Sequence, residues 1–312
     1  MRSGSTRTTD GALRRWVAAA ASSLRLVADR PALWLAGGLA WLTTVGWLPF
    51  VLAVVSLPGE GELPYLGSGF WTSGLWPLNA LLLAAAAVAV VVLALTLASA
   101  GNAVLVASAE GRAPSTRETG SLLVMALLGA LPVAVCVLAI GIATVMIGPA
   151  EFNRPDVESS ALLRIAVRIA PLLVFTGALT IVASTLAGLA GRAAMQIGRA
   201  DAAIAVVPEL ARRAGRAGLV HVVIAVAVGV LTILLAGSLL AVLWAPIRAG
   251  LSGGGILDLA GVLLLVGFVA IWLCLVLAGG AVHAWASVTA TMLLGREGSR
   301  VADRPQEMLI DR

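Results

Sequence analysis

The sequence predicts an all-α membrane protein: six transmembrane helices arranged as three tandem helical hairpins, preceded by an N-terminal interfacial amphipathic helix. Composition supports this fold class first. Of the 312 residues, 60% are hydrophobic and only 12% are charged, whereas soluble globular chains average about 45–50% and about 25%. The mean hydropathy is +1.01, and the apolar residues are concentrated in long runs. This composition argues against a soluble globular fold.

The N-terminal segment predicts a helix that lies along the membrane surface. We expect residues 1–10 to be disordered and residues 11–30 to be helical, ending at Arg30-Pro31. One face of this helix is apolar: Leu13, Trp16, Ala20, Leu24 and Val27. The opposite face is polar: Arg14, Ser22, Arg25 and Asp29. Such a helix lies in the headgroup region. Because the first long apolar run starts only after Arg30, we expect the segment to be retained rather than cleaved.

Apolar segments long enough to cross a bilayer follow the amphipathic helix. A hydrocarbon core of about 30 Å needs about 20 apolar residues, and a helix satisfies the backbone hydrogen bonds there. The predicted spans are residues 32–57, 77–109, 121–148, 161–191, 218–245 and 256–294. They form a transmembrane domain over residues 31–295, followed by a cytoplasmic tail over residues 296–312.

The placement of arginine predicts the orientation. All 21 basic residues are arginine, and seventeen of them lie in the termini and in the connections near residues 110–120 and 192–217. Cytoplasmic segments carry an excess of basic residues, so both termini are predicted to be cytoplasmic. This placement also explains the net charge of +5, and we expect no nucleic-acid partner. Absent lysine beside abundant alanine, glycine and arginine is typical of GC-rich bacterial coding, which indicates a bacterial plasma membrane.

The connection GRADAAIAVVPELARRAGRAG, residues 198–218, carries four arginines and two acidic residues between two long apolar segments. Pro208 is expected to start a short helix, and Gly215 or Gly218 to end it. Glu209 lies three and four residues before two arginines, within side-chain reach on a helix. Two interpretations apply to the three arginines Arg212, Arg213 and Arg216. They anchor the segment to anionic lipid headgroups on the cytoplasmic face, or they dock a cytoplasmic or membrane partner such as an ATPase.

An internal repeat of about ninety residues is suggested by ASAGNAVLV, GLAGRAAMQ and LAGGAVHAW. Aligning Gly101, Gly191 and Gly280 places each near the cytoplasmic end of an even-numbered span. Small residues let helices approach closely in lipid, so we expect these three helices to meet there. Residues 256–294 extend for about 58 Å at about 1.5 Å per residue, longer than the core, and their end is expected to project into the cytoplasm.

Ionisable residues within the spans are few, and each has a structural and a functional interpretation. His221 and His283 lie in the fifth and sixth spans; His283 is either simply hydrogen-bonded or a ligand contact. Arg164 and Arg168 share a face at the outer end of the fourth span. They bind an anionic headgroup or substrate, or they pair with acidic residues, for which Glu158 and Asp258 are available.

No catalytic, cofactor or metal site is predicted. The sequence contains neither HExxH nor GxxxxGK[ST], and Cys136 and Cys274 are too few for a thiolate cluster. We therefore expect a non-enzymatic membrane scaffold or a regulatory or accessory protein that interacts with lipids or partner proteins. A permease subunit, working with a separate ATPase or exporting an amphiphile, is the alternative. A membrane enzyme acting on lipid is the third class.

Three segments carry a resemblance to a known class: DRPALWLAGGLAWL, ASAEGRAPSTRETGSLL and GRADAAIAVVPELARRAGRAGL. Their layout resembles the bacterial six-helix membrane domain joined to some glycerophosphodiester phosphodiesterases, and related uncharacterised membrane proteins. The resemblance implies the fold over nearly the whole chain and no active site, because the phosphodiesterase domain is absent. Three tandem hairpins are also found in mitochondrial carriers, but the PxDxxK/R signature of that family is missing from the odd-numbered spans.

Overall fold

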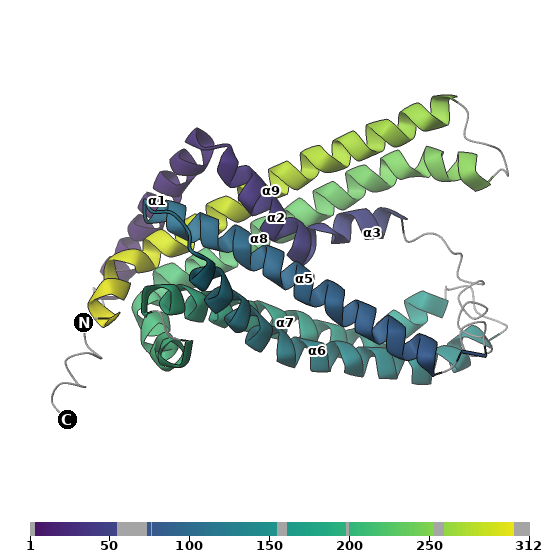
Figure 1. The fold of residues 1–312 in the computed structure, drawn as a ribbon, viewed down its shortest axis with the longest axis horizontal. Helices are drawn as coiled ribbons and strands as arrows, with labels where there is room; N and C mark the ends of the chain where they lie inside the picture. Colours follow the sequence, from purple (N-terminus) through teal and green to yellow (C-terminus); the bar gives the residue numbers. More distant parts are fainter. Residues whose placement is uncertain are drawn as a thin grey trace. The chain divides into compact units, whose positions relative to one another are not determined.

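The computed structural model describes residues 4–54, 74–75, 77–154, 161–197, 200–252 and 259–302 (Figure 1). Every regular element in these ranges is a helix. Five of the helices are long and apolar enough to cross a membrane. The predicted all-α class is therefore confirmed for the described part of the chain.

The N-terminal helix is longer than predicted. α1 extends from Gly4 to Asp29, so it begins inside residues 1–10, which the sequence predicts to be disordered; residues 1–3 lie outside the described residues. A helix is costly to nucleate but adds further residues cheaply. Because α1 packs against α8 and α9, the extra residues extend a helix that tertiary contacts already hold.

The first predicted span, residues 32–57, is not a single α-helix. It consists of α2 (Ala32–Trp41), the π-helical segment η1 (Leu42–Gly46) and α3 (Leu48–Val54). Residues 55–57 lie outside the described residues.

Local sequence accounts for this interruption. Thr43 and Thr44 donate side-chain hydrogen bonds of 2.7 Å to the carbonyl oxygens of Leu39 and Ala40, four residues earlier. Such bonds compete for helix carbonyl groups and bend the helix. Pro49 has no N–H group to continue the ladder, and it is tolerated because it lies in the first turn of α3. The chain therefore restarts its helix at Leu48.

The longer helices overlap the other predicted spans but differ from them at their ends. They are α5 (Leu78–Ala109), α6 (Thr116–Phe152), α7 (Ala161–Ile197), α8 (Ala200–Ser252) and α9 (Leu259–Ala302). The predicted connection over residues 192–217 is largely helical, because α7 and α8 extend into it. α9 also continues into the predicted tail, residues 296–312; residues 256–258 and 303–312 lie outside the described residues.

α5 ends in a Schellman motif. Gly111 has a positive φ of 73°, a conformation that costs glycine little. Its N–H donates to Ser108 O at 3.2 Å, and the N–H of Arg112 donates to Ala107 O at 2.9 Å. These two bonds satisfy carbonyl groups that the helix end would otherwise leave open.

α6 begins with a capping box formed by Ser115 and Glu118. The Glu118 N–H donates to Ser115 Oγ at 3.3 Å, and the Ser115 N–H donates to Glu118 Oε2 at 2.9 Å. This reciprocal pair satisfies two N-terminal donors. Arg112 forms ion pairs with both Glu118 and Glu110, so the whole connection between α5 and α6 is held by charged groups.

α8 is two helices joined at Gly215, which has φ +51° and ψ −138°. The predicted helix end at Gly215 is thus confirmed. The predicted start at Pro208 is wrong, because α8 begins at Ala200 and contains Pro208 in its interior. Burial of Ala203 and Leu210 on either side of the proline stabilises the turns that proline alone would interrupt.

The charge pairs predicted in this segment are present. Glu209 forms ion pairs with Arg212 at 2.9 Å and with Arg213 at 2.7 Å. The Arg212 side chain remains 77% exposed. Exposed pairs of this kind stabilise a helix by only about 0.3–0.5 kcal/mol each, so most of the charge in this segment remains at the surface.

The described helices belong to two compact units. Unit 1 comprises Met1–Val55, Leu93–Val124 and Leu189–Arg312, and unit 2 comprises Ser56–Val92 and Met125–Gly188. α5, α6 and α7 each contribute residues to both units.

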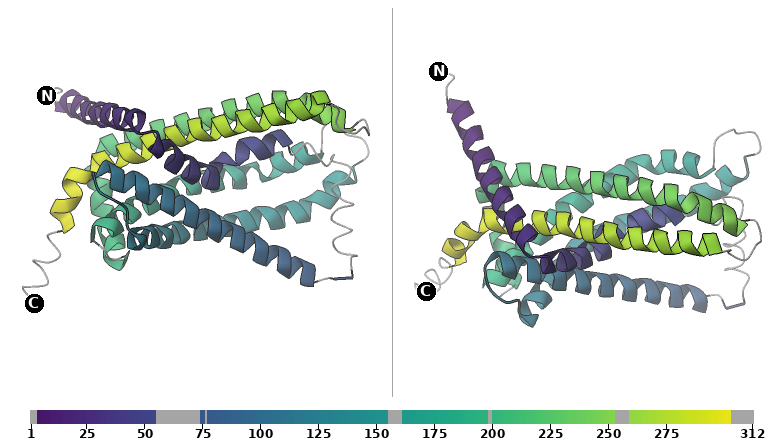
Figure 2. Two further views of the ribbon diagram at one scale, coloured as in Figure 1. Left: turned by 45° about the horizontal axis from the view of Figure 1, so that its top comes forward. Right: turned by 90° about the horizontal axis from the view of Figure 1, so that it is seen from above.

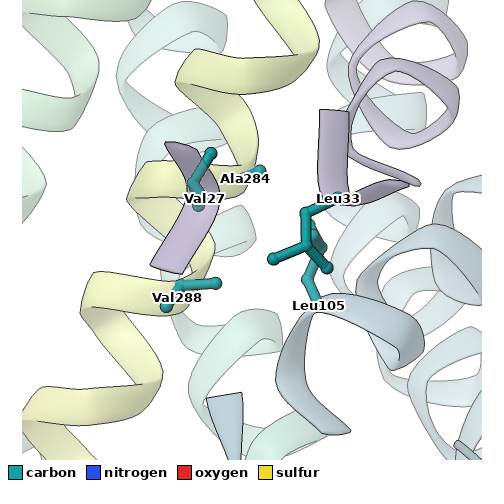
Figure 3. Close-up of a cluster of buried hydrophobic side chains, with 5 residues drawn as sticks. All are labelled: Val27, Leu33, Leu105, Ala284 and Val288. Carbon is teal, nitrogen blue, oxygen red and sulfur yellow. The ribbon is translucent and has the colours of Figure 1, made fainter. Parts of the chain in front are cut away.

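In unit 1, α8 and α9 lie side by side (Figure 2). α2 packs against α9, α3 against α8, and α1 against both α8 and α9. One buried cluster joins α1, α2, α5 and α9 (Figure 3): Val27, Leu33, Leu105, Ala284 and Val288. A second buried cluster joins α8 and α9 through Leu240, Ile247 and Phe268.

In unit 2, α6 and α7 form an antiparallel pair. A Cβ placed on Gly129 of α6 would lie 2.8 Å from Ala187 Cβ and 3.3 Å from Ala183 O of α7. Farther along the pair, Glu151 of α6 contacts Arg164 of α7. The later residue of α6 thus meets the earlier residue of α7, which defines the antiparallel direction.

Apolar side chains also cover the outside of the helices. In α5, the consecutive residues Leu81, Leu82 and Leu83 are 62–64% exposed. Consecutive residues lie about 100° apart around a helix, and the exposed side chains of Val88, Val90 and Val91 cover the remaining directions, so this stretch is apolar on all sides. Soluble monomers rarely expose such large apolar surfaces, whereas a helix that is hydrophobic all round is typical of a membrane span.

Candidate functional site

Contacts between helix backbones shape the interior of unit 1. A Cβ on Gly280 of α9 would lie 2.5 Å from both Gly38 Cα and Trp34 O of α2. A Cβ on Gly101 of α5 would lie 2.5 Å from Ala36 O, also of α2. Only glycine allows such an approach, and small residues serve this purpose at helix interfaces in membranes.

This arrangement differs from the one predicted for the repeat. The sequence predicts that Gly101, Gly191 and Gly280 bring α5, α7 and α9 into mutual contact. Instead, Gly101 and Gly280 both face α2, because α2 is a short apolar helix with two glycines of its own. The three long helices do meet in unit 1, through apolar contacts of α5 with α9 and with α7 and through polar side chains.

Five polar side chains form a hydrogen-bonded group that we call the Asn102 network: Asn102 of α5, Arg192 of α7, and His283, Ser287 and Thr291 of α9. Arg192 Nε donates to Thr291 Oγ1 at 3.1 Å. Arg192 Nη2 donates to the carbonyl and hydroxyl oxygens of Ser287 at 3.2 and 3.3 Å. Asn102 Oδ1 lies 3.1 Å from His283 Nε2 and 3.4 Å from Ser287 Oγ.

Hydrogen-bond directions in the network follow from the amide of Asn102. Its Nδ2 donates to Ala98 O at 3.0 Å, so Oδ1 is the acceptor for the other two contacts. His283 Nε2 must then carry a proton, and the Ser287 hydroxyl donates to the same oxygen. The hydrogen bonds therefore form a chain of donation in which Arg192 donates to Ser287 and Ser287 donates to Asn102.

This direction matters for chemistry. A nucleophilic serine needs a base that accepts its proton, but Ser287 and His283 both donate to one amide oxygen. The geometry therefore holds α5, α7 and α9 together rather than activating Ser287. His283, predicted as either a hydrogen-bonded residue or a ligand contact, is a member of this network.

α1 is attached to α9 beside the network. Ser23 Oγ lies 2.5 Å from Thr289 Oγ1, and Trp285 Nε1 donates to Ala20 O at 3.2 Å. The Trp16 ring meets the Trp285 ring edge-on at a centroid distance of 6.4 Å. α1 is therefore a packed element of unit 1.

This packing divides the predicted apolar face of α1. Ala20 and Val27 are buried, whereas Leu13 and Leu24 are exposed, together with Val17. The exposed apolar side chains form a strip beside the buried one. The sequence alone does not distinguish these strips, because both are apolar.

His221 is the second histidine in unit 1. It is buried in α8, and its ring lies 6.5 Å from that of Trp285. Its Nδ1 has no hydrogen-bond partner among the described atoms. Among the described residues no group of three or more His, Cys, Asp or Glu side chains is arranged to hold a metal ion.

In unit 2, Arg164 and Arg168 converge on Glu151, and with Arg154 they form what we call the Glu151 cluster. Arg164 Nε donates to Glu151 Oε2 at 2.8 Å, and Arg164 Nη2 donates to Glu151 O at 2.5 Å. Arg168 Nη2 lies 2.8 Å from Oε1, and Arg154 Nη1 lies 3.8 Å from Oε2. The shared face predicted for Arg164 and Arg168 is thus present.

The acidic partner differs from those considered in the sequence. Glu158 and Asp258 lie outside the described residues, and the partner within them is Glu151. Its side chain is only 1% exposed, and a buried carboxylate needs paired cations. The predicted span, residues 121–148, ends just before it, so α6 extends into the ion cluster.

Several site residues have sequence signals that pattern reasoning did not use. Asn102 and Arg192 directly follow Gly101 and Gly191 of the repeat, so the repeat marks the polar contact as well as the close approach. Ser287 and Thr291 lie four and eight residues after His283, on the same helix face. Glu151 has no comparable signal, because its partners follow a connection whose length does not specify how the helices pack.

Comparisons with known proteins add no family to this description: no family model matches the chain, and neither a curated protein nor a solved structure matches it. The resemblance to the membrane domain of glycerophosphodiester phosphodiesterases stays a prediction.

Proposed function

We propose that this chain is a multi-pass protein of the bacterial plasma membrane that acts as a non-enzymatic scaffold or as a regulatory or accessory protein. The observation that supports this most is the close packing of unit 1. Backbones touch at Gly101 and Gly280, and Asn102, His283 and Ser287 bond to one another. Substrate sites in transporters are built instead from polar groups left open near the middle of the bilayer.

The topology that we propose has six spans in three hairpins, with α2, η1 and α3 together forming the first. Both termini lie in the cytoplasm, following the arginine bias. α1 then lies at the inner interface, with Leu13, Val17 and Leu24 toward the acyl chains. Arg14 and Arg25 are exposed on the same helix, where they contact anionic headgroups.

Affinity purification from the native membrane, at native expression, tests the scaffold proposal. We expect a reproducible set of membrane or cytoplasmic proteins to be recovered with the chain. These proteins should be lost when the membrane is fully solubilised in harsh detergent. Recovery of the chain with lipid alone, under conditions that preserve known complexes, would contradict it.

A permease subunit is the second proposal, and one feature of α8 favours it. Gly215 separates the segment from Ala200 to Ala214 from the rest of α8, and Arg212 on that segment is 77% exposed. A short, charged helix set off by a break is suited to docking a cytoplasmic ATPase. The same arginines serve equally as lipid anchors, so charge reversal must separate the two roles.

The test replaces Arg212, Arg213 and Arg216 with glutamate. A docking helix loses its partner on purification while the chain still inserts. A matched control reverses Arg14, Arg15 and Arg25 of α1, three exposed arginines of a different segment. If both triple variants lose expression or insertion equally, the arginines act through topology and lipid, and the permease proposal loses its support.

A further inference from the structure

The Glu151 cluster contains more positive charge than its carboxylate neutralises. Three guanidinium groups, from Arg154, Arg164 and Arg168, surround one carboxylate. Each guanidinium has five N–H donors, and a carboxylate has about four acceptor positions. Arg164 uses two of its nitrogens on Glu151 and is only 15% exposed. Its role is to join α6 to α7.

The other two arginines are differently placed. Arg154 is 54% exposed and Arg168 is 48% exposed. The contact of Arg168 with Glu151 is a single ion pair, and that of Arg154 is longer, at 3.8 Å. Glu151 therefore orients both guanidinium groups without occupying them, which leaves donors available to an anion.

These two arginines line an open depression of about 300 Å³ in unit 2. Leu163 and Val167 also line it, and both are exposed. Leu163 and Val167 are one helical turn apart and lie next to Arg164 and Arg168 in the sequence of α7. The depression thus has a charged side and an apolar side.

We propose that this depression binds the phosphate group of an anionic phospholipid, with the phosphate between Arg154 and Arg168 and an acyl chain along Leu163 and Val167. Arginine is suited to bidentate contact with phosphate oxygens. Both arginines lie near helix ends, because Arg154 is two residues past the end of α6 and Arg168 is about 10 Å from the start of α7 at a rise of about 1.5 Å per residue.

The same phosphate chemistry would fit a free anion, but the apolar side favours a lipid. Inorganic phosphate gains nothing from Leu163 and Val167, whereas an acyl chain does. The site rests on the membrane placement proposed above, and it holds equally for a scaffold and for a permease subunit. By the arginine bias it is assigned to the outer leaflet.

The full-length protein in detergent, titrated with phosphatidylglycerol and followed by native mass spectrometry, tests the site. The double variant Arg154→Gln/Arg168→Gln is expected to bind phosphatidylglycerol at least about tenfold more weakly, because the loss of even one charge-assisted hydrogen bond accounts for that factor. Its preference for phosphatidylglycerol over phosphatidylcholine should also disappear. The control Arg117→Gln/Arg248→Gln removes two exposed arginines elsewhere and should bind as the wild type does.

Three outcomes would overturn the proposal or part of it. Equal phosphatidylglycerol binding by the double variant and the wild type removes the site altogether. Displacement of the bound lipid by millimolar inorganic phosphate assigns the site to a free anion. If the double variant does not fold, the single variant Arg154→Gln replaces it in the same titration, because this side chain is half exposed and its ion pair with Glu151 is the longest of the three. A wild-type chain that stays in the membrane fraction yet binds no phosphatidylglycerol contradicts this site without contradicting the membrane placement.

Discussion

Unit 1 and unit 2 both join helices through polar side chains, but they do so by different chemistry. The Asn102 network uses neutral acceptors, and its one charged member, Arg192, donates to hydroxyl and carbonyl oxygens. The Glu151 cluster uses opposite charges and leaves two of its arginines half exposed. The first is combined with backbone contacts at glycine; the second lies where α6 ends and α7 begins.

This difference follows from the surroundings of each group. Between packed helices an unpaired polar atom is costly, so Arg192, His283 and Ser287 place their donors on acceptors from other helices. At helix ends, water and headgroups solvate surplus charge, so a cluster with more arginines than carboxylates is tolerated. The stability of unit 1 is therefore expected to depend on the size and shape of its side chains. The stability of unit 2 is expected to depend on ionic strength and on bound anions.

The largest effect is expected from Gly280→Ala in unit 1. The new Cβ would overlap the backbone of α2 at Gly38 and Trp34, and backbone cannot turn aside as a side chain can. We expect a loss of about 3 kcal/mol in the free energy of unfolding, measured by thermal or denaturant unfolding in detergent.

Gly267→Ala on the same helix is the matched control, because no other helix among the described residues has an atom within 4 Å of a Cβ there. It should be neutral or stabilising by about 0.5–1 kcal/mol, since alanine favours a helix over glycine. Equal stability of the Gly280→Ala and Gly267→Ala variants would contradict the close contact between α2 and α9.

A smaller effect is expected from Asn102→Ala. The change leaves His283 and Ser287 without their common acceptor. We therefore expect the free energy of unfolding to fall by about 2 kcal/mol. Thr232→Val is its control, because within the described part of the chain the hydroxyl of Thr232 bonds to Val228 O of its own helix and to no other helix. If Asn102→Ala unfolds like Thr232→Val, the network does not hold these helices together.

The smallest effect on stability is expected from Glu151→Gln. Its dependence on salt distinguishes unit 2 from unit 1 most clearly. Removing the negative charge leaves three arginines facing one another, but two of them are half exposed and can turn to solvent. The midpoint of thermal unfolding should fall at low salt and recover at about 1 M salt, where the Debye length is about 3 Å. The effect of Asn102→Ala should not change with salt. If the fall in the unfolding midpoint of Glu151→Gln does not depend on salt, the proposed difference between the charged cluster of unit 2 and the neutral network of unit 1 is contradicted.

The structure agrees best with the sequence-based predictions where the signal is local. The ion pairs of Glu209 follow from spacing on one helix, and the break at Gly215 follows from the freedom of glycine to adopt positive φ. The same reasoning failed at residues 32–57, where the apolar run hides the interruption at η1. Mean hydropathy does not detect that Thr43, Thr44 and Pro49 change the hydrogen bonding of an apolar segment.

The sites needed more than local pattern. His283 could be selected as an ionisable residue in an apolar helix, and Arg164 and Arg168 could be placed on one face. Their partners could not be chosen, because Asn102 lies 181 residues from His283 in the sequence and Glu151 was one of several acids near the same connection.

By itself, the sequence determined that the chain is helical, that its helices are long and apolar, and where most of the arginines lie along it. These properties depend on residues close together in the chain and on the solvent in which a helix is stable. The tertiary structure alone decided that Gly101 and Gly280 both face α2, that Asn102 accepts from His283 and Ser287, and that Glu151 lies among three arginines. Those contacts depend on which helix faces meet, and many apolar faces are chemically alike, so only packing of the whole chain distinguishes them.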